Sequence, residues 1–157
     1  MTVPAFQDLY PEGWSHCFGC GRLNEKGHHI RSFWDGEETV CTMSPEPWQI
    51  ALPGYVYGGY LACLVDCHST GSAAAALHRA AGQPMDQGPY PRCVTASLKV
   101  DYLKPTLLGP PIELRSQIVS VKGRKVVVST SLRVEGQECV RGEAVLIQVP
   151  EDAFTPR

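Results

Sequence analysis

The chain has 157 residues, of which 43% are hydrophobic and 19% are charged, and its formal net charge is −2. Charges of both signs are scattered along it and no basic run is longer than two residues, which argues against a nucleic-acid partner. The apolar stretches are too short and too interrupted to span a bilayer. Residues 1–11 have neither a basic start nor an apolar centre, so we expect no secretory signal and a cytoplasmic location.

The length fits one domain that buries its own core. We therefore predict a single domain over residues 1–157. Residues 1–27 are rich in glycine, proline and polar side chains, and we expect an irregular N-terminal cap there. The core of the domain is expected at residues 28–150.

The chain contains seven cysteines. An odd number without an export signal favours free thiols over a disulfide framework. Cys41, Cys63, Cys93 and Cys139 lie in apparently regular segments and are typical of small, buried, apolar residues.

The first regular elements are predicted to be two short strands. Residues 29–34 and 38–43 are strand-like, and Asp35-Gly36 between them is a strong signal for a hairpin turn. From about Gly58 the pattern changes to one long helix of roughly 20 residues, since no proline follows until Pro84. This helix is apolar over most of its circumference, which indicates that other structure wraps it.

Four strand-like segments, separated by turn signals, follow the helix. They cover residues 94–102, 112–121, 125–134 and 138–149. Their alternation of apolar and polar side chains, with turns at Lys122-Gly123 and Glu135-Gly136, predicts an antiparallel meander. Two strands, one helix and four strands are an α+β order. We predict the hotdog fold, in which a six-stranded antiparallel sheet wraps around one long central helix.

The first half of the helix carries the candidate chemistry. Gly58 and Gly59 open it, where free backbone N–H groups and the helix dipole favour negative charge and a ligand can approach closely. A carbonyl that becomes an oxyanion needs such donors. Asp66, eight residues after Gly58, can act as a base or a nucleophile. The alternatives are close helix–loop packing for the glycines and a buried, hydrogen-bonded acid for Asp66.

The spacing between these residues has a geometric consequence. Eight helical residues span about 12 Å, so Gly58 and Asp66 of one chain cannot both touch one carbonyl. If both act on it, one of them comes from a second copy whose helix runs antiparallel. This leads to the hypothesis of a two-fold homodimer with shared sites.

Three segments together resemble a known family. Tyr57-Gly58-Gly59 with Asp66 has the spacing of a motif in which His-Gly-Gly, six residues and Asp open a central helix. Residues 94–105 resemble the strand after that helix, and Cys17-Phe18-Gly19-Cys20-Gly21 resembles the opening of one branch. From about residue 17 to 149 the chain therefore resembles the PaaI-like (4-hydroxybenzoyl-CoA thioesterase-like) acyl-CoA thioesterases of the hotdog superfamily.

The resemblance implies a role for each matched residue. Asp66 matches the catalytic carboxylate, the backbone N–H of Gly58 matches the group that polarises the thioester carbonyl, and Thr95 matches a residue that helps to hold the nucleophilic water. It also implies homodimers or homotetramers (dimers of dimers), with coenzyme A as part of the substrate and no separate cofactor. The residues expected to contact substrate are Tyr57, Gly59, Tyr60 and Thr70, with Leu61 near the acyl group.

Two positions depart from the family pattern. The family's histidine is Tyr57 here, and a phenol does not titrate near neutral pH and is bulkier than an imidazole. Ala51 stands about where relatives have Asn or Gln near the water, and Gln49 is a candidate substitute.

The other polar residues of the helix have simpler interpretations. Thr70 lies four residues after Asp66 on the same helix face, so it is a candidate hydrogen-bond partner of the carboxylate. His68 points about 200° away from Asp66 and does not pair with it directly. We expect His68 to be a packed or surface histidine, and Ser69 and Ser72 to be small packing residues.

Cys17 and Cys20 form a C-x-x-C motif, with His16, His28 and His29 nearby in the sequence. A closed zinc site needs four ligands, and these residues could supply them. The alternatives are a redox dithiol and a tight turn with partly buried thiols. We favour the tight turn and assign no metal ligand, because no second C-x-x-C follows.

The leading functional prediction is an acyl-CoA thioesterase that hydrolyses an aryl- or medium-chain acyl-CoA thioester. One subunit would supply the carboxylate and the other the helix N-terminus. Arg92, Lys104 and Arg124 are candidate contacts for the coenzyme A phosphates. The alternatives are a non-catalytic acyl-CoA-binding hotdog protein, which Tyr57 favours, and a zinc-bound structural or interaction module built on Cys17 and Cys20. A hotdog dehydratase is weaker, because no suitable pair of histidine and acid is visible.

Overall fold

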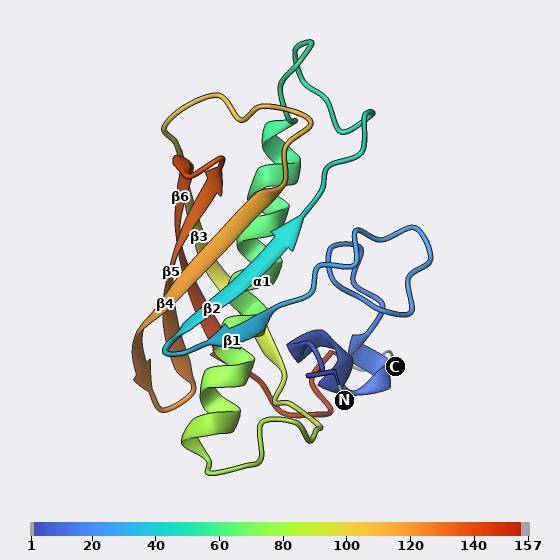
Figure 1. Cartoon of the computed structure of the whole chain (residues 1–157). Helices are drawn as coiled ribbons and strands as arrows, with labels where there is room; N and C mark the ends of the chain where they lie inside the picture. Colours follow the sequence, from blue (N-terminus) through green and yellow to red (C-terminus); the bar gives the residue numbers. More distant parts are fainter. Residues whose placement is uncertain (1, 155–157) are drawn as a thin grey trace.

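A computed structural model describes residues 2–154, and its main feature is a six-stranded sheet that curves around one long helix (Figure 1). The helix α1 covers Gly58–Ala80, and two short 3-10 helices, η1 (Phe6–Leu9) and η2 (Glu12–Trp14), lie in the N-terminal cap. This architecture confirms the predicted α+β hotdog fold. The strands are β1 (Phe33–Asp35), β2 (Glu38–Met43), β3 (Cys93–Tyr102), β4 (Ile112–Lys122), β5 (Lys125–Val134) and β6 (Gln137–Gln148).

The strand order is β1-β2-β4-β5-β6-β3, and every neighbouring pair is antiparallel. β4, β5 and β6 form a meander, but β3 pairs with β6 at an edge of the sheet, so the prediction of a four-stranded meander is wrong. The reason lies in residues 103–111, which pair with the loop before the helix instead of forming a tight turn. Val56 N–H donates to the Thr106 carbonyl at 2.8 Å, and Leu108 N–H donates to the Gly54 carbonyl at 2.9 Å.

The first strand is shorter than predicted. Residues 29–32 are not part of it, because their backbone serves the N-terminal cap. Ser32 N–H donates to Gln7 Oε1 at 2.8 Å, and the Ser32 carbonyl accepts from Phe6 N–H at 2.9 Å. His29 has a positive φ of 55°, which also interrupts an extended strand. The hairpin turn to β2 is present as predicted, with Gly36 at φ 63°.

Helix α1 is buried around most of its circumference, because the sheet covers one side and the cap covers part of the other (Figure 1). Its second half is built from small buried residues, including Gly71 and the alanines at 73–76. A Cβ at Gly71 would lie 2.6 Å from the Gln7 side-chain nitrogen. The cap therefore sits directly on the helix at this glycine.

The buried polar side chains of α1 are hydrogen-bonded, which confirms the packing role expected for them. His68 Nδ1 lies 2.8 Å from Ser32 Oγ, and Ser72 Oγ lies 2.6 Å from Thr39 Oγ1. Ser69 makes a similar contact with a strand hydroxyl at 3.2 Å. These bonds offset the cost of removing hydroxyl and imidazole groups from water.

Two further expectations concern membranes and thiols. Among residues 2–154 no helix has both the length and the apolar character needed to cross a membrane. All seven cysteines are free, and Cys41, Cys93 and Cys139 are buried as predicted. Cys63 is only half-buried, so the prediction is wrong for this residue, which lies against the cap turn at Gly19.

Gly142 of β6 allows the helix to approach the sheet. A Cβ at Gly142 would lie 2.4 Å from Cγ1 of the fully buried Val65. We expect Gly142→Ala to lower the free energy of unfolding by about 1–3 kcal/mol through overpacking. Val65→Ala, although destabilising by itself, should make the added methyl group tolerable in the double variant. Urea unfolding of the four proteins measures this coupling, and strictly additive effects would contradict the close contact.

The buried His68 determines part of the pH dependence of stability. Burial lowers its pKa from 6.5 to about 4, so the folded protein keeps the ring neutral while the unfolded chain protonates it below about pH 6.5. This contribution to stability is complete above pH 6.5 and is lost as the pH falls from 6.5 towards 4, by about 3 kcal/mol at most.

The corresponding test compares urea unfolding of three proteins at about pH 7 and about pH 4.5. In His68→Gln the loss of stability on acidification should be smaller than in the wild type. The exposed His16 provides the control, and His16→Gln should behave like the wild type. An unchanged acid sensitivity in His68→Gln would contradict the assignment to this imidazole.

Candidate active site

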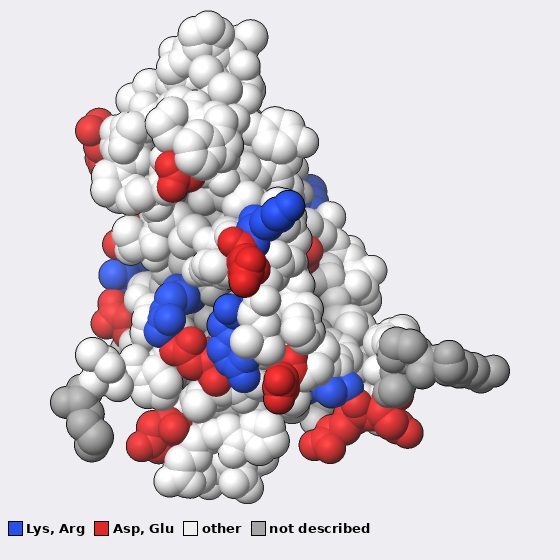
Figure 2. Space-filling view, turned by 90° about the vertical axis from the view of Figure 1, so that its right-hand side faces the viewer, with Lys and Arg blue, Asp and Glu red and all other residues white. Residues whose placement is uncertain are grey.

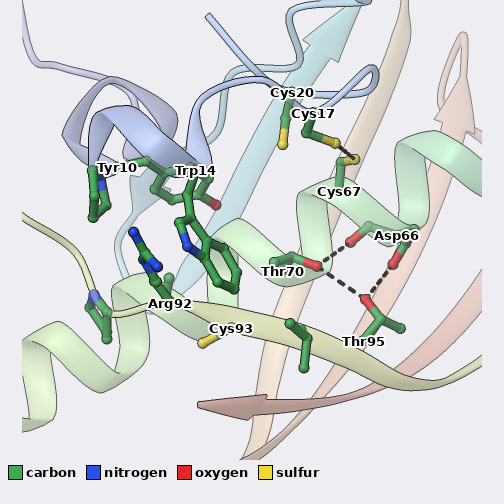
Figure 3. Close-up of a pocket in the computed structure, with 14 residues that line it drawn as sticks. Tyr10, Trp14, Cys17, Cys20, Asp66, Cys67, Thr70, Arg92, Cys93 and Thr95 are labelled. Carbon is green, nitrogen blue, oxygen red and sulfur yellow. Dashed lines mark hydrogen bonds between the residues drawn. The ribbon is translucent and has the colours of Figure 1, made fainter. Parts of the chain in front are cut away.

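A pocket of about 280 Å³ opens beside the middle of helix α1 (Figure 3). The helix contributes Asp66 and Thr70, β3 contributes Thr95, and the cap contributes Tyr10 and Trp14. Asp66 is half-buried, so its carboxylate forms part of the pocket wall and remains within reach of a small molecule.

One carboxylate oxygen of Asp66 is held by the protein and the other is free. Thr95 Oγ1 donates to Asp66 Oδ1 at 2.6 Å (Figure 3). Among residues 2–154, Asp66 Oδ2 has no hydrogen-bond partner. A carboxylate that lines a pocket and is fixed through one oxygen, with the other unbonded, can accept a proton from a bound water.

Thr70 does not bond the Asp66 carboxylate, so that prediction is wrong. Its Oγ1 donates to the Asp66 backbone carbonyl at 3.0 Å, which is the local bond that a helical threonine commonly makes four residues back. The Thr70 and Thr95 oxygens are 3.3 Å apart, but both hydroxyl protons are already donated elsewhere. Thr70 therefore shapes the pocket next to Thr95 without holding the acid itself.

The start of the helix presents two backbone donors. The N–H groups of Gly58 and Gly59 precede the first intrahelical bond and have no hydrogen-bond partner among residues 2–154, so they can bind an anionic oxygen. Tyr102 Oη donates to the Gly58 carbonyl at 2.8 Å and ties β3 to the helix start. Tyr57 is 56% exposed, and its ring covers Gly59, where a Cβ would lie 2.4 Å from the phenol oxygen.

The predicted site residues therefore form two groups. Asp66, Thr70 and Thr95 meet in the pocket, whereas Tyr57 and the two glycines at the helix start do not line it. The separation agrees with the helical distance of about 12 Å between the glycines and the acid.

The remaining residues predicted near the helix start lie in the core or in loop contacts. Tyr60 and Leu61 are buried, and the Tyr60 ring packs edge-on against His28 at 4.9 Å. Gln49 Nε2 lies 3.1 Å from His28 Nδ1, and Gln49 Oε1 accepts from Glu46 N–H at 2.7 Å. Gln49 is thus engaged by neighbouring loops and does not line the pocket with Asp66.

Arg92 is the predicted coenzyme A contact that lines the pocket, while Lys104 and Arg124 do not. Its guanidinium group lies 4.6 Å from the centre of the Trp14 ring. Arg92 Nε is buried and has no hydrogen-bond partner among residues 2–154. Sequence reasoning missed Trp14, because an aromatic residue in an irregular cap carries no motif that would mark it as a pocket wall.

Three cysteines form a cluster on the pocket wall (Figure 3). Hydrogen bonds from the thiols of Cys20 and Cys67 lower the pKa of Cys17 to about 2, and donating to Cys17 raises the pKa of Cys20 to about 12. Sequence reasoning paired Cys17 and Cys20 with nearby histidines and missed Cys67. His28 and His29 instead contact Gln49 and a backbone carbonyl.

The end of the molecule at the helix start carries few charges. On the face shown in Figure 2, Lys, Arg, Asp and Glu gather over the middle and lower parts. The upper end is formed by loops 44–57 and 103–111 (Figure 1). These loops expose a set of large apolar side chains, namely Trp48, Ile50, Leu52, Tyr55, Tyr57, Leu103 and Leu107.

A six-stranded antiparallel sheet around one helix, with an acid in a pocket on that helix, defines a hotdog-fold protein. A family model described as the thioesterase superfamily matches residues 53–140, which is more than half of the chain. The chain belongs to the thioesterase superfamily.

One curated relative is acyl-coenzyme A thioesterase THEM4 of Xenopus laevis. It is 32% identical over 108 residues, which cover 69% of this chain and 43% of the relative. The chain thus spans less than half the length of this relative.

Solved structures show the same fold. A thioesterase superfamily protein from Shewanella loihica is 40% identical, with a TM-score of 0.68 over 90% of this chain and 100% of that one. The PaaI protein of E. coli is 16% identical, with a TM-score of 0.64 over 80% and 83% of the two chains. A Streptococcus mutans protein described as bound to acetyl-CoA is also 16% identical, with a TM-score of 0.61 over 76% and 88%.

Proposed function

We propose that this protein is an acyl-CoA thioesterase that hydrolyses aryl- or medium-chain acyl-CoA thioesters, in the cytoplasm, as a homodimer or a dimer of dimers. The observation that carries the proposal is the state of Asp66, which lines the pocket, has its Oδ1 held by Thr95 and has no hydrogen-bond partner at Oδ2 among residues 2–154. Membership of the thioesterase superfamily and similarity to an acyl-coenzyme A thioesterase support this choice of chemistry.

In the proposed reaction Asp66 acts as a general base. Its free oxygen takes a proton from a water, and the resulting hydroxide attacks the thioester carbonyl carbon. The Gly58 N–H stabilises the oxyanion that forms. The carbon–sulfur bond then breaks, and the coenzyme A thiolate leaves and is protonated. The products are a carboxylic acid and free coenzyme A.

A second copy of the chain would complete each site. Asp66 and Gly58 lie about 12 Å apart along one helix, so the two groups can meet only across an interface between antiparallel helices. β3 is an edge strand of ten residues that ends at the helix start, and Leu98 and Tyr102 on it are exposed. Together with the apolar loops 44–57 and 103–111, this strand offers a surface that a homodimer could bury.

Arg92 is the preferred candidate contact for the anionic part of coenzyme A. It shares the pocket with Asp66, and its guanidinium group, which also donates to the Glu151 carbonyl, brings a positive charge to the pocket wall. A phosphate group would pair with this charge. The acyl group would then extend towards the helix start of the other subunit, near Tyr57 and Gly59.

A second candidate function is acyl-CoA binding without hydrolysis. The observation that favours it is Tyr57, whose ring covers Gly59 where the family has a histidine in the motif. Binding of an acyl-CoA without release of coenzyme A would support this alternative.

The role of Asp66 is tested by measuring hydrolysis of aromatic and medium-chain acyl-CoAs. Asp66→Asn should lower kcat by about 100-fold or more, because a carboxamide cannot take the proton. Chromatography of free coenzyme A is the suitable measurement, since thiol reagents would also react with the seven cysteines of the chain.

Two substitutions of Thr95 test how much the hydrogen bond to Asp66 contributes to activity. Thr95→Val removes the donor to Asp66 Oδ1 at nearly constant size and should lower kcat by about 10-fold. Thr95→Ser keeps the hydroxyl and should remain close to the wild type. Equal activity of the wild type, Asp66→Asn and Thr95→Val would reject the assigned roles.

The shared site predicts complementation between two inactive variants. Gly58→Pro removes only the N–H at the first helical position, where proline is favoured, and Tyr57 before it is already extended with φ −61° and ψ 127°. An equal, randomly reassembled mixture of Gly58→Pro and Asp66→Asn should recover about a quarter of the wild-type rate, since half of the dimers contain one intact site. No recovery in confirmed heterodimers would contradict a site shared between Gly58 of one chain and Asp66 of the other.

A further inference from the structure

Three cysteine sulfurs meet where the N-terminal cap contacts helix α1 (Figure 3). The Sγ atoms of Cys17, Cys20 and Cys67 all lie within 4.8 Å of one another, and those of Cys17 and Cys67 are 3.8 Å apart. Two sulfur ligands that bind a tetrahedral zinc ion at about 2.3 Å are about 3.8 Å apart. Disulfide sulfurs are much closer, at about 2.05 Å. The spacing therefore suits ligands of a shared metal ion.

The turn that carries Cys17 and Cys20 presents sulfur to this point. Backbone groups of Gly19 and Cys20 lie beside the Cys17 thiol and lower its pKa, and Gly21 N–H donates to the Cys17 carbonyl at 2.7 Å. Backbone donors aimed at a sulfur stabilise the thiolate that a metal requires. A Cβ at Gly21 would lie 2.4 Å from the Cys17 nitrogen, so this tight turn requires glycine.

Cys63 offers a fourth sulfur beside this cluster, although the three sulfurs within 4.8 Å of one another are those of Cys17, Cys20 and Cys67. It lies one helical turn before Cys67 on the same face of α1. Gly19 lies over both residues, because a Cβ there would be 2.3 Å from Cys67 Sγ and 3.0 Å from Cys63 Sγ. The glycine thus lets the cap turn approach both helix sulfurs.

We propose that Cys17, Cys20, Cys63 and Cys67 bind one zinc ion that joins the N-terminal cap to helix α1. Four thiolates make a closed structural site, and soft sulfur ligands select zinc over magnesium, calcium and manganese. Thiols that are still protonated release their protons when the ion binds. The proposal rests on the cysteine geometry and is independent of thioester hydrolysis.

The site has a consequence for the pocket. Cys67 directly follows Asp66, and Cys17 and Cys20 line the same pocket as that acid. A bound ion would hold the cap against this part of the helix and so keep the wall beside Asp66 in place. Its role is structural, since all four coordination positions are occupied by sulfur.

Metal analysis of the 157-residue chain, produced with zinc in the medium and purified under reducing conditions, tests the proposal. We expect about one zinc ion per chain. Cobalt(II) in place of zinc should give thiolate-to-cobalt charge-transfer absorption in the near ultraviolet and strong visible bands of a tetrahedral ion. Removal of zinc by a chelator should lower the Tm by about 5 °C or more, because a ligand that binds only the folded state stabilises it.

Four serine variants locate the ligands. Cys17→Ser and Cys67→Ser should lose stoichiometric zinc, because each breaks the group of three sulfurs within 4.8 Å of one another. Cys63 lies outside that group, so Cys63→Ser should keep some zinc and lose about a quarter of the charge-transfer intensity, since one of four thiolates is removed. Cys93→Ser is the matched control, because Cys93 lines the same pocket but is outside the sulfur cluster. It should keep full zinc content.

Three results would overturn the proposal. The first is wild-type protein with neither stoichiometric zinc nor charge-transfer bands after addition of cobalt. The second is a Cys17–Cys67 disulfide that persists under the same reducing conditions, shown by intact mass and peptide mapping. The third is a loss of zinc in Cys93→Ser as large as that in Cys67→Ser, which would indicate general unfolding rather than loss of a ligand.

Discussion

The structure depends on the burial of one helix on nearly all sides. A helix wrapped by a sheet and a cap must carry small residues where neighbours approach closely, and its polar side chains must find partners away from water. Helix α1 meets both requirements. Gly71 contacts the cap, Gly142 of β6 makes room for Val65, and burial keeps the imidazole of His68 neutral while Ser32 provides a hydrogen-bond partner.

Asp66 is the exception on this helix, and the surrounding elements explain why. The end of the cap and the start of β3 do not close over it, so the helix faces a pocket at that point instead of packed side chains. Thr95 on β3 donates a hydrogen bond to one oxygen of the carboxylate, and the other oxygen remains available. The fold thereby keeps an acid at half-burial, where it can be positioned by the protein and still meet a small molecule.

The start and the middle of the helix also differ in the chemical groups that they expose. Its start presents the Gly58 and Gly59 N–H groups among exposed apolar loops, while its middle presents the acid and the sulfur cluster. A straight helix cannot bring its own start to its own middle. The proposed shared site therefore follows from the rigidity of α1, and the sparsely charged end provides the surface through which a second copy would supply the missing half.

Much of this protein was predictable from local sequence patterns. The lack of proline between Gly58 and Pro84 defined the helix, and alternation with turn signals located β2, β4, β5 and β6 to within about two residues. The spacing of Gly58 and Asp66 and the position of Thr95 pointed to the residues that hold the candidate chemistry. These features depend on neighbours along the chain, which a sequence displays directly.

Only the tertiary structure decided which distant segments meet. The place of β3 beside β6 depends on the pairing of residues 103–111 with the loop before the helix, and no local pattern encodes a partner so far away. The sulfur cluster also depends on a contact between distant segments, because Cys67 meets Cys17 and Cys20 only when the cap folds onto α1. Thr70 could be placed on the face of Asp66 from helical periodicity, but whether it bonds the carboxylate or the backbone is set by the exact position of β3 and Thr95.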